Sequence, residues 1–243
     1  MKHLHLTTYM LCFLLVIGCA LMPVSLHAND TLNTPIDEKI VYLTFDDGPT
    51  PKITDAILDV LKSEDVKATF FIVGKEIKGR EEILTRIYNE GHGIGLHTYS
   101  HNFKIIYKDP NTFISEMEKT ETVINETLGT QLRFPIIRFP GGSSGRLNTN
   151  FYNALCEKGY LIFDWNVDLQ DGVKGHLSPS EFLANAKKCM DRSERRIILA
   201  HCNANNTNTC KALSDIIAYY KQQGYRFEAI TENTSPYFYR FKK

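Results

Sequence analysis

Three of the eight histidines lie in one short stretch, GHGIGLHTYSH (91–101), and two of them, His97 and His101, are four residues apart. Such a pair is also typical of a solvated strand end, so the pair alone does not establish a metal site. Two imidazoles and one carboxylate form the ligand set of a catalytic zinc, with one position open for water. The adjacent carboxylates Asp46 and Asp47 in TFDDGP can supply that ligand and a base, although DDGP is also ordinary turn chemistry.

Further polar side chains end apolar stretches elsewhere: Arg138 in RFPGG, Asp168 and Asp171 in DWNVDLQDG, and His201 in IILAH. Taken singly, each is explained as well by a bend or by a satisfied core residue. An arginine can hold a carboxylate through a forked hydrogen bond. A histidine outside the metal sphere can protonate a leaving group while an aspartate fixes its tautomer. Together these residue types are sufficient for metal-assisted hydrolysis of an acyl bond.

The surrounding sequence alternates between apolar β-rich stretches and segments with helical periodicity. The strands are predicted at 39–45, 67–74, 92–97, 136–139, 160–167, 195–201 and 225–230. The helices are predicted at 51–61, 80–91, 110–129, 148–159, 178–190 and 210–224. This alternation indicates parallel βαβ units in a single α/β domain, either a barrel or an open doubly wound sheet. Because every polar group above follows a strand, we expect them to converge on the face formed by the carboxyl ends of the strands.

The chain has 243 residues with 28 basic and 28 acidic side chains, and this balance gives no indication of a nucleic-acid partner. Residues 1–28 resemble a secretion signal, with residues 29–38 forming a polar lead. We therefore expect a secreted or cell-envelope protein. Membrane contact is expected only through an uncleaved N-terminus, or through lipidation of Cys19 if VIGC is a lipobox.

The four remaining cysteines are compatible with two disulfides in an exported chain. Cys202 and Cys210 bracket a short loop and are predicted to pair, whereas Cys156 and Cys189 would pair only if their helices meet.

The motifs TFDDGP, HTYSH, RFPGG, DWNVDLQD and IILAH, in this order, resemble those of the polysaccharide deacetylases of carbohydrate esterase family 4, the NodB-homology domain. The resemblance covers residues 39–232 and leaves 233–243 as a C-terminal tail. It implies a distorted (β/α) barrel of about seven parallel strands and a hydrolase that removes N-acetyl groups from an amino-sugar polymer. The implied cofactor is one divalent metal ion, with zinc as the default and cobalt or nickel as alternatives.

The resemblance also implies roles for individual residues. Asp46 is the base and is oriented by Arg138, and the implied metal ligands are Asp47, His97 and His101. His201 is the implied acid, and the sequence leaves open whether Asp168 or Asp171 orients it. The backbone N–H of Gly141 would stabilise the oxyanion, and Trp165 could stack on a sugar face.

The sequence departs from the family pattern at three positions. Gly141 and Gly172 stand where relatives often carry an aromatic residue, and Cys202 stands where they often carry aspartate. The two glycines predict an open groove. Phe139 in the third motif could face substrate, but core packing is the expected role.

The expected substrate is an N-acetylglucosamine polymer, most simply peptidoglycan because the signal places the protein near the cell wall. A chitooligosaccharide deacetylase and an O-acetyl xylan esterase would use the same residues. A non-catalytic wall-binding pseudoenzyme would have lost a ligand or the base, and the sequence retains all of them. A zinc peptidase is disfavoured because the sequence has no HExxH.

Overall fold

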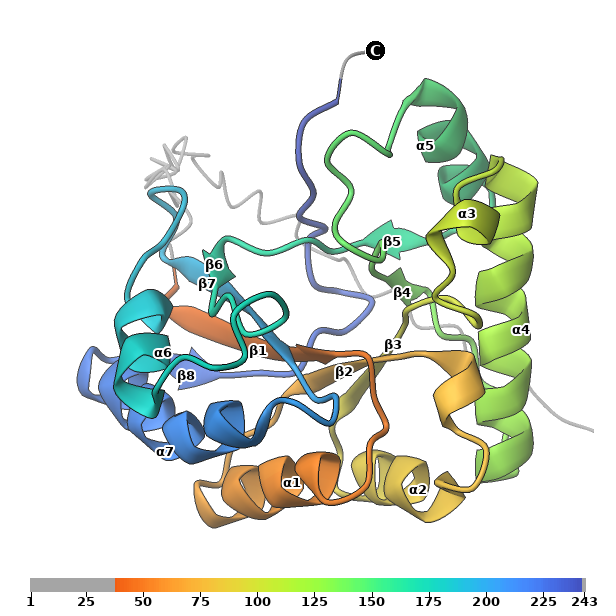
Figure 1. The fold of residues 1–243 in the computed structure, drawn as a ribbon. Coiled ribbons are helices and arrows are strands. Elements are labelled where there is room, and N and C mark those ends of the chain that lie inside the picture. The colour runs from red at the N-terminus through yellow and green to blue at the C-terminus, as the bar shows by residue number, and fades with distance from the viewer. Residues whose placement is uncertain (1–37, 242–243) are drawn as a thin grey trace, which may run out of the picture. The chain divides into compact units, whose positions relative to one another are not determined.

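The computed structural model describes residues 38–241, which contain one sheet surrounded by helices (Figure 1). The strands are β1 Ile40–Asp46, β2 Thr69–Ile72, β3 Gly93–Leu96, β4 Ile136–Ile137, β5 Leu161–Ile162, β6 Val167–Asp168, β7 Arg195–His201 and β8 Arg226–Phe227. The helices are α1 Ile53–Ser63, the 3-10 helix η1 Gly74–Glu76, α2 Glu81–Asn89, α3 Phe103–Ile106, α4 Pro110–Leu128, α5 Thr149–Glu157, α6 Pro179–Ala186 and α7 Thr207–Gln222.

The strands pair in parallel in the order β5-β4-β3-β2-β1-β7-β6, and β8 adds to the start of β1. Strands β5 and β6 are at opposite ends of this order, yet only residues 163–166 separate them in the sequence. Such a link spans roughly 17 Å at most, so the sheet must curl until its two edges approach each other. The predicted distorted (β/α) barrel in one domain is therefore confirmed, as a curled half-barrel.

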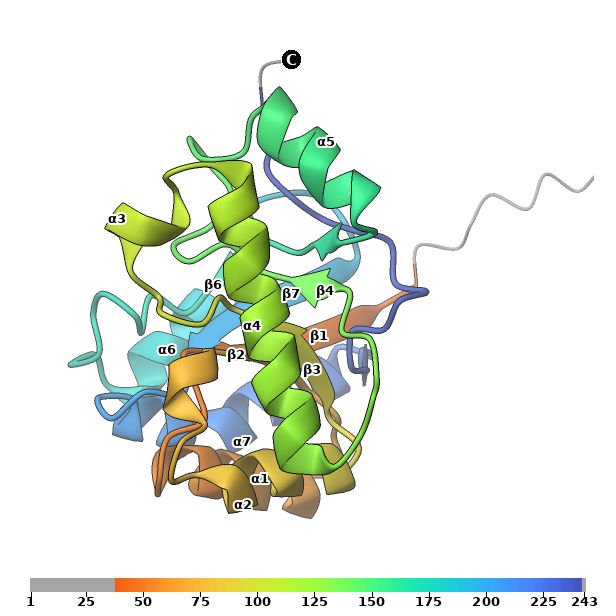
Figure 2. The same cartoon turned by 90° about the vertical axis from the view of Figure 1, so that its right-hand side faces the viewer.

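The longer helices pack side by side around the outside of the curled sheet, in the order α6, α7, α1, α2, α4, α5 (Figures 1 and 2). Strand β1 is buried along its whole length, and its side chains contribute to two hydrophobic cores. Its residues Val41, Leu43 and Phe45 pack in the core shared with the helices, while Ile40 and Tyr42 face the interior of the half-barrel. Because side chains alternate along a strand, Asp46 shares the interior face with Ile40 and Tyr42.

The predicted strand 160–167 is wrong in one respect, because it consists of two strands on opposite edges of the sheet. β5 pairs with β4, β6 pairs with β7, and the chain between them crosses the gap. The polar residues Asp164 and Asn166 interrupt this stretch, but local sequence does not specify such a change of partner. The predicted helix 178–190 ends at Ala186, because the backbone of Cys189 forms an isolated antiparallel β-bridge with Val167. The short helices η1 and α3 were not predicted.

The segment after residue 232 fills the gap between β5 and β6. Tyr237 bridges in parallel to Phe163, and its carbonyl accepts a hydrogen bond from the N–H of Asp164 at 2.6 Å. The N–H of Tyr239 donates to the Asp164 carboxylate at 2.9 Å, and the Tyr239 hydroxyl donates to the Trp165 carbonyl at 3.0 Å. The C-terminal segment thus holds the crossover that carries Trp165.

All four cysteines of the described chain are free thiols, so the predicted Cys202–Cys210 disulfide is wrong. The buried Cys202 thiol donates to the Asp46 carbonyl at 3.2 Å, whereas the Cys210 thiol is directed to the Ile53 carbonyl at 3.7 Å. The predicted signal segment 1–28 and nearly all of the polar lead lie outside the described residues. Within residues 38–241, no helix is long and apolar enough to cross a membrane.

Candidate active site

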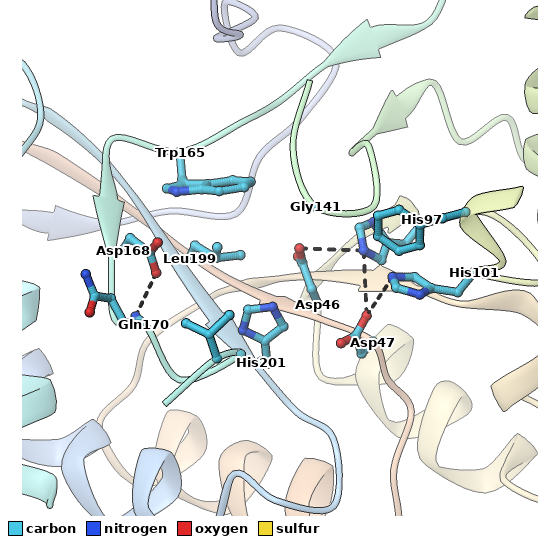
Figure 3. Close-up of a pocket in the computed structure, with 13 residues that line it drawn as sticks. Asp46, Asp47, His97, His101, Gly141, Trp165, Asp168, Gln170, Leu199 and His201 are labelled. Atoms are coloured by element: carbon cyan, nitrogen blue, oxygen red, sulfur yellow. Dashed lines mark hydrogen bonds and ion pairs between the residues drawn. The ribbon is translucent and has the colours of Figure 1, made fainter. Parts of the chain in front are cut away.

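The predicted site residues come together at the carboxyl ends of the parallel strands, around a pocket of about 370 Å³ (Figure 3). Of these residues, only Arg138 and Asp171 do not line the pocket; both are buried. The residues that line it are Asp46, Asp47, His97, His101, Gly141, Trp165, Asp168 and His201.

Asp47, His97 and His101 form a group whose ligand atoms all lie within 4.8 Å of one another. One carboxylate oxygen of Asp47 is 3.3 Å from Nε2 of His101 and 3.6 Å from Nε2 of His97. The positive φ of Asp47, 75°, turns the chain directly after β1 and directs this side chain away from the sheet interior that Asp46 faces. One carboxylate and two imidazoles at this spacing fit a divalent metal ion with an open coordination position.

The environment of His97 favours the form that binds metal. Its Nδ1 lies 3.0 Å from the carbonyl of Arg138. A carbonyl can only accept, so Nδ1 carries the proton and Nε2 keeps its lone pair toward Asp47. Burial lowers the pKa of His97 to about 3, so its imidazole is neutral.

Arg138 is fully buried and is held by the central strand β1 and by the crossover that follows β5. Its Nη1 donates to the Asp46 carboxylate at 2.8 Å and to the Thr44 hydroxyl at 2.7 Å. Its Nε donates to the carbonyl of Phe163 at 2.8 Å and its Nη2 donates to that of Asp164 at 3.1 Å, both in the crossover after β5. Its contact with Asp46 is a single hydrogen bond rather than the expected fork, because the other donors hold the crossover.

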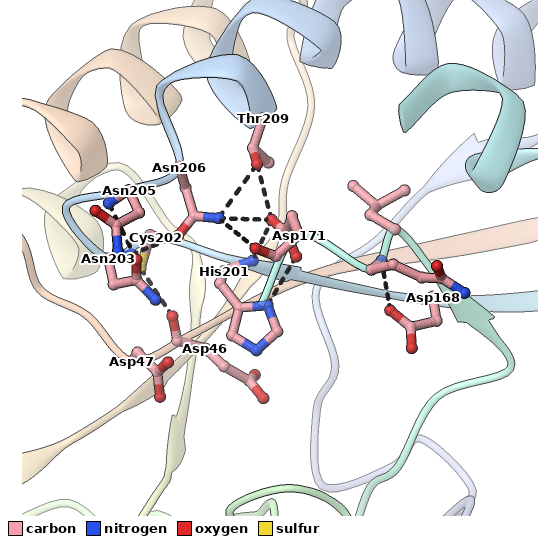
Figure 4. A network of polar contacts seen from close by, with 12 residues as sticks. Asp46, Asp47, Asp168, Asp171, His201, Cys202, Asn203, Asn205, Asn206 and Thr209 are labelled. Atoms are coloured by element: carbon pink, nitrogen blue, oxygen red, sulfur yellow. Dashed lines mark hydrogen bonds and ion pairs between the residues drawn. The ribbon is translucent and has the colours of Figure 1, made fainter. Parts of the chain in front are cut away.

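Asp171, and not Asp168, is hydrogen-bonded to His201 (Figure 4). The two side chains meet at 2.7 Å between Nδ1 and the carboxylate, and the N–H of His201 donates to the other oxygen at 2.9 Å. Asp168 instead accepts the N–H of Gln170 at 2.7 Å. The positive φ of Gln170, 63°, turns the chain so that the second aspartate reaches back toward β7.

Two residues that sequence reasoning missed complete this network. The Thr209 hydroxyl donates to the Asp171 carboxylate at 2.8 Å, and the Asn206 amide donates to it at 3.1 Å. Both belong to the polar segment NANNTNT between Cys202 and Cys210, whose composition was the available signal.

The electrostatics of His201 suit a proton donor. Burial disfavours its charged form, but the hydrogen bond and charge of Asp171, with the charges of Asp46 and Asp47, outweigh burial and raise its pKa to about 9. The imidazole is therefore protonated near neutral pH and lies on the opposite side of Asp46 from the two other histidines (Figure 3).

The predicted open groove at the two glycines is wrong. A Cβ on Gly141 would lie 3.1 Å from Nη2 of Arg146 and 3.3 Å from the ring of Phe103, which occupy this space. A Cβ on Gly172 would lie 2.5 Å from the imidazole of His201. Both glycines therefore allow close packing.

No acceptor in residues 38–241 pairs with the N–H of Gly141. Phe139 is buried in the core, as expected.

Comparison with known proteins agrees with this fold. The sequence model of the polysaccharide deacetylase family matches residues 33–162. A protein from Bacillus cereus named peptidoglycan-N-acetylglucosamine deacetylase is 32% identical over 206 residues, which cover 82% of this chain and 71% of that protein. The chain thus belongs to the polysaccharide deacetylase family, a family of hydrolases.

Two solved structures are similar throughout the domain. A CE4 esterase from Streptococcus mutans has a TM-score of 0.74 and 32% identity, covering 80% of this chain and 87% of that one. The polysaccharide deacetylase Bc1974 from Bacillus cereus has a TM-score of 0.74 and 31% identity, covering 83% and 97%.

Proposed function

We propose that this chain is an exported, zinc-dependent deacetylase that removes N-acetyl groups from N-acetylglucosamine residues of peptidoglycan. The observation that carries the proposal is the cluster of Asp47, His97 and His101, with the carboxylate of Asp46 and the imidazole of His201 facing the same pocket. The polymer is supported by relatives that bear the name peptidoglycan-N-acetylglucosamine deacetylase. Export is supported by the apolar N-terminal sequence.

The side chains divide the reaction between two ends of the pocket. A divalent ion held by the cluster would polarise the acetyl carbonyl and lower the pKa of an attacking water. Asp46, oriented by Arg138, accepts a proton from that water while the water oxygen bonds to the carbonyl carbon. His201 donates its Nε2 proton to the nitrogen as the C–N bond breaks, leaving acetate and a free amine.

Two other groups support this division of roles. Asp171 holds Nδ1 of His201, so that Nε2 faces the pocket. The unpaired N–H of Gly141 is available to the oxyanion that develops on the carbonyl oxygen.

The same groups would also hydrolyse an acetyl ester, so chitin oligomers and acetylxylan are the alternative substrates. The pseudoenzyme alternative is disfavoured because the chain retains the candidate metal ligands, base and acid. The test measures acetate release from peptidoglycan, chitin oligomers and acetylxylan by protein treated with a chelator, with and without added Zn²⁺. Asp46→Asn protein is the matched control.

We expect zinc-dependent release from peptidoglycan, and muramidase fragments that each lack one acetyl group on the glucosamine. Intact acetyl groups on those fragments, with rapid release from either other polymer, would overturn the choice of polymer. Full activity after verified removal of the metal would overturn the metal site.

A further inference from the structure

Arg146 lies at the rim of the pocket in a fixed position that the proposed chemistry does not use. Its Nη1 donates to the carbonyls of Gly141 at 2.9 Å and Gly142 at 3.1 Å. Its Cζ lies over the rings of Phe103 and Tyr107, at 5.2 Å and 5.1 Å from their centroids. These hydrogen bonds and ring contacts restrict the conformations of this long side chain.

The charge of Arg146 has no counterpart within the described chain. Residues 38–241 place no carboxylate within ion-pair distance of it, as is also true of Arg192, Arg195 and Arg240, whereas Arg80, Arg86, Arg133, Arg138 and Arg226 are paired. Its Nε and Nη2 donate to no acceptor in the same range. Nη2 lies beside Gly141, which lines the pocket together with Phe103. Two free donors on a planar cation therefore stand next to the reaction site.

We propose that Arg146 is a specificity residue that binds a carboxylate on the part of the substrate next to the sugar being deacetylated. A guanidinium with an open edge binds a planar carboxylate through paired hydrogen bonds. The pocket itself does not favour an anion, because Asp46, Asp47 and Asp168 line it. A protonated His201 and a divalent ion only offset these charges. An anionic group next to the sugar being deacetylated therefore requires an additional cation on the protein.

This inference rests on the proposed function, because peptidoglycan carries carboxylates beside its N-acetylglucosamine. They come from two sources, the lactyl group of the neighbouring sugar and the stem peptide. In either case Gly141 has a specific purpose, since a side chain there would displace Nη2 from the rim.

The test compares kcat/KM on four substrates: strands with stem peptides intact, strands with peptides removed and the lactyl carboxylate free, the same strands with that carboxylate converted to a methylamide, and a chitin tetramer. Arg146→Gln is expected to reduce the preference for carboxylate strands over methylamide strands roughly 10- to 100-fold. Arg146→Lys should restore part of this preference. Raising the salt concentration should reduce the wild-type preference and leave that of Arg146→Gln unchanged.

Arg226→Gln is the matched control, because Arg226 is exposed and pairs with the start of β1, at the opposite end of the strand from Asp46. It should keep the wild-type preference. A preference seen only with intact peptides would identify the peptide as the source of the carboxylate. Equal loss on all substrates in Arg146→Gln, or wild-type rates that are equal on strands with intact peptides, carboxylate strands and methylamide strands, would overturn the proposal while deacetylation stands.

Binding measurements separate this proposal from the proposed function. The affinities of Asp46→Asn protein for the four glycans, with and without Arg146→Gln, do not require turnover. Carboxylate-selective binding that disappears with Arg146→Gln would support the inference even if wild-type protein released no acetate, whereas unselective binding would refute it.

Discussion

Replacing Asp171 with asparagine tests the assignment of the acid most directly, because it removes a charge and changes little volume. Asp171 is the partner of Nδ1 in His201, at 2.7 Å, and helps to raise the pKa of that imidazole from its ordinary 6.5 to about 9. This difference corresponds to about 3 kcal/mol in favour of the imidazolium. In Asp171→Asn, burial is no longer outweighed, and the pKa is expected to fall to 6.5 or below.

The consequence for activity follows from the protonated fraction of the acid. At pH 8, a group with a pKa of about 9 is ~90% protonated, and one with a pKa of 6.5 is ~3% protonated. We therefore expect kcat/KM at pH 8 to fall by about 30-fold or more. The wild-type profile should decline as pH rises through about 9, whereas that of the variant should already decline near pH 6.5.

Asp168→Asn is the matched control, because it also removes one carboxylate charge near the reaction site, but from a residue that makes no hydrogen bond to His201. In this control, kcat/KM should decline at nearly the same alkaline pH as in the wild type. If kcat/KM of Asp171→Asn still declines only near pH 9, or if the decline shifts to lower pH equally in both variants, the assignment of Asp171 as the partner of the acid is refuted.

The same linkage predicts a pH-dependent stability in metal-free protein. The pKa of His201 is higher in the folded than in the unfolded state, so its stabilising contribution is fully present below about pH 6.5 and is lost as pH rises through about 9. Urea unfolding should show an advantage of wild type over Asp171→Asn that narrows by at most about 3 kcal/mol between pH 6 and pH 10. If the difference in the free energy of unfolding does not change with pH, the lost hydrogen bond, and not the lost charge, accounts for the destabilisation of Asp171→Asn.

Three further outcomes are expected. Asp46→Asn should keep its metal and lose turnover, whereas Asp47→Ala should lose metal; equal metal loss in both, measured by elemental analysis, would mean that the roles are shared. Gly172→Ala should lower kcat about tenfold or more at unchanged metal content, because its Cβ would lie 2.5 Å from the imidazole of His201; wild-type kcat would show that the imidazole moves without cost. Thiol titration of denatured, unreduced protein cleaved before residue 38 should find four free thiols, and two would restore a disulfide.

Much of the site could be predicted from the sequence, for a reason that lies in parallel sheets. Each polar motif directly follows an apolar run, and parallel strands place all their carboxyl ends on one face. The convergence of Asp46, His97 and His201 therefore required only the correct order of strands and helices. Local chemistry also set helix ends, as at Gly129, whose φ of 64° is a left-handed cap.

Other features depend on contacts between residues far apart in the chain. The split of 160–167 into β5 and β6 is set by partners on opposite edges of the sheet, which the local sequence cannot specify. The choice between Asp168 and Asp171 depends on one left-handed residue, Gln170, which places the second carboxylate against β7.

The two glycines of the pocket show the same limit. From the sequence, Gly141 and Gly172 predict empty space, because a glycine contributes no side chain of its own. In the folded chain that space belongs to Arg146 and to His201, which come from other parts of the sequence. The sequence by itself determined which groups do the chemistry and on which face they meet. Only the tertiary structure decided which neighbours fill the remaining volume, because packing depends on side chains that local sequence does not bring together.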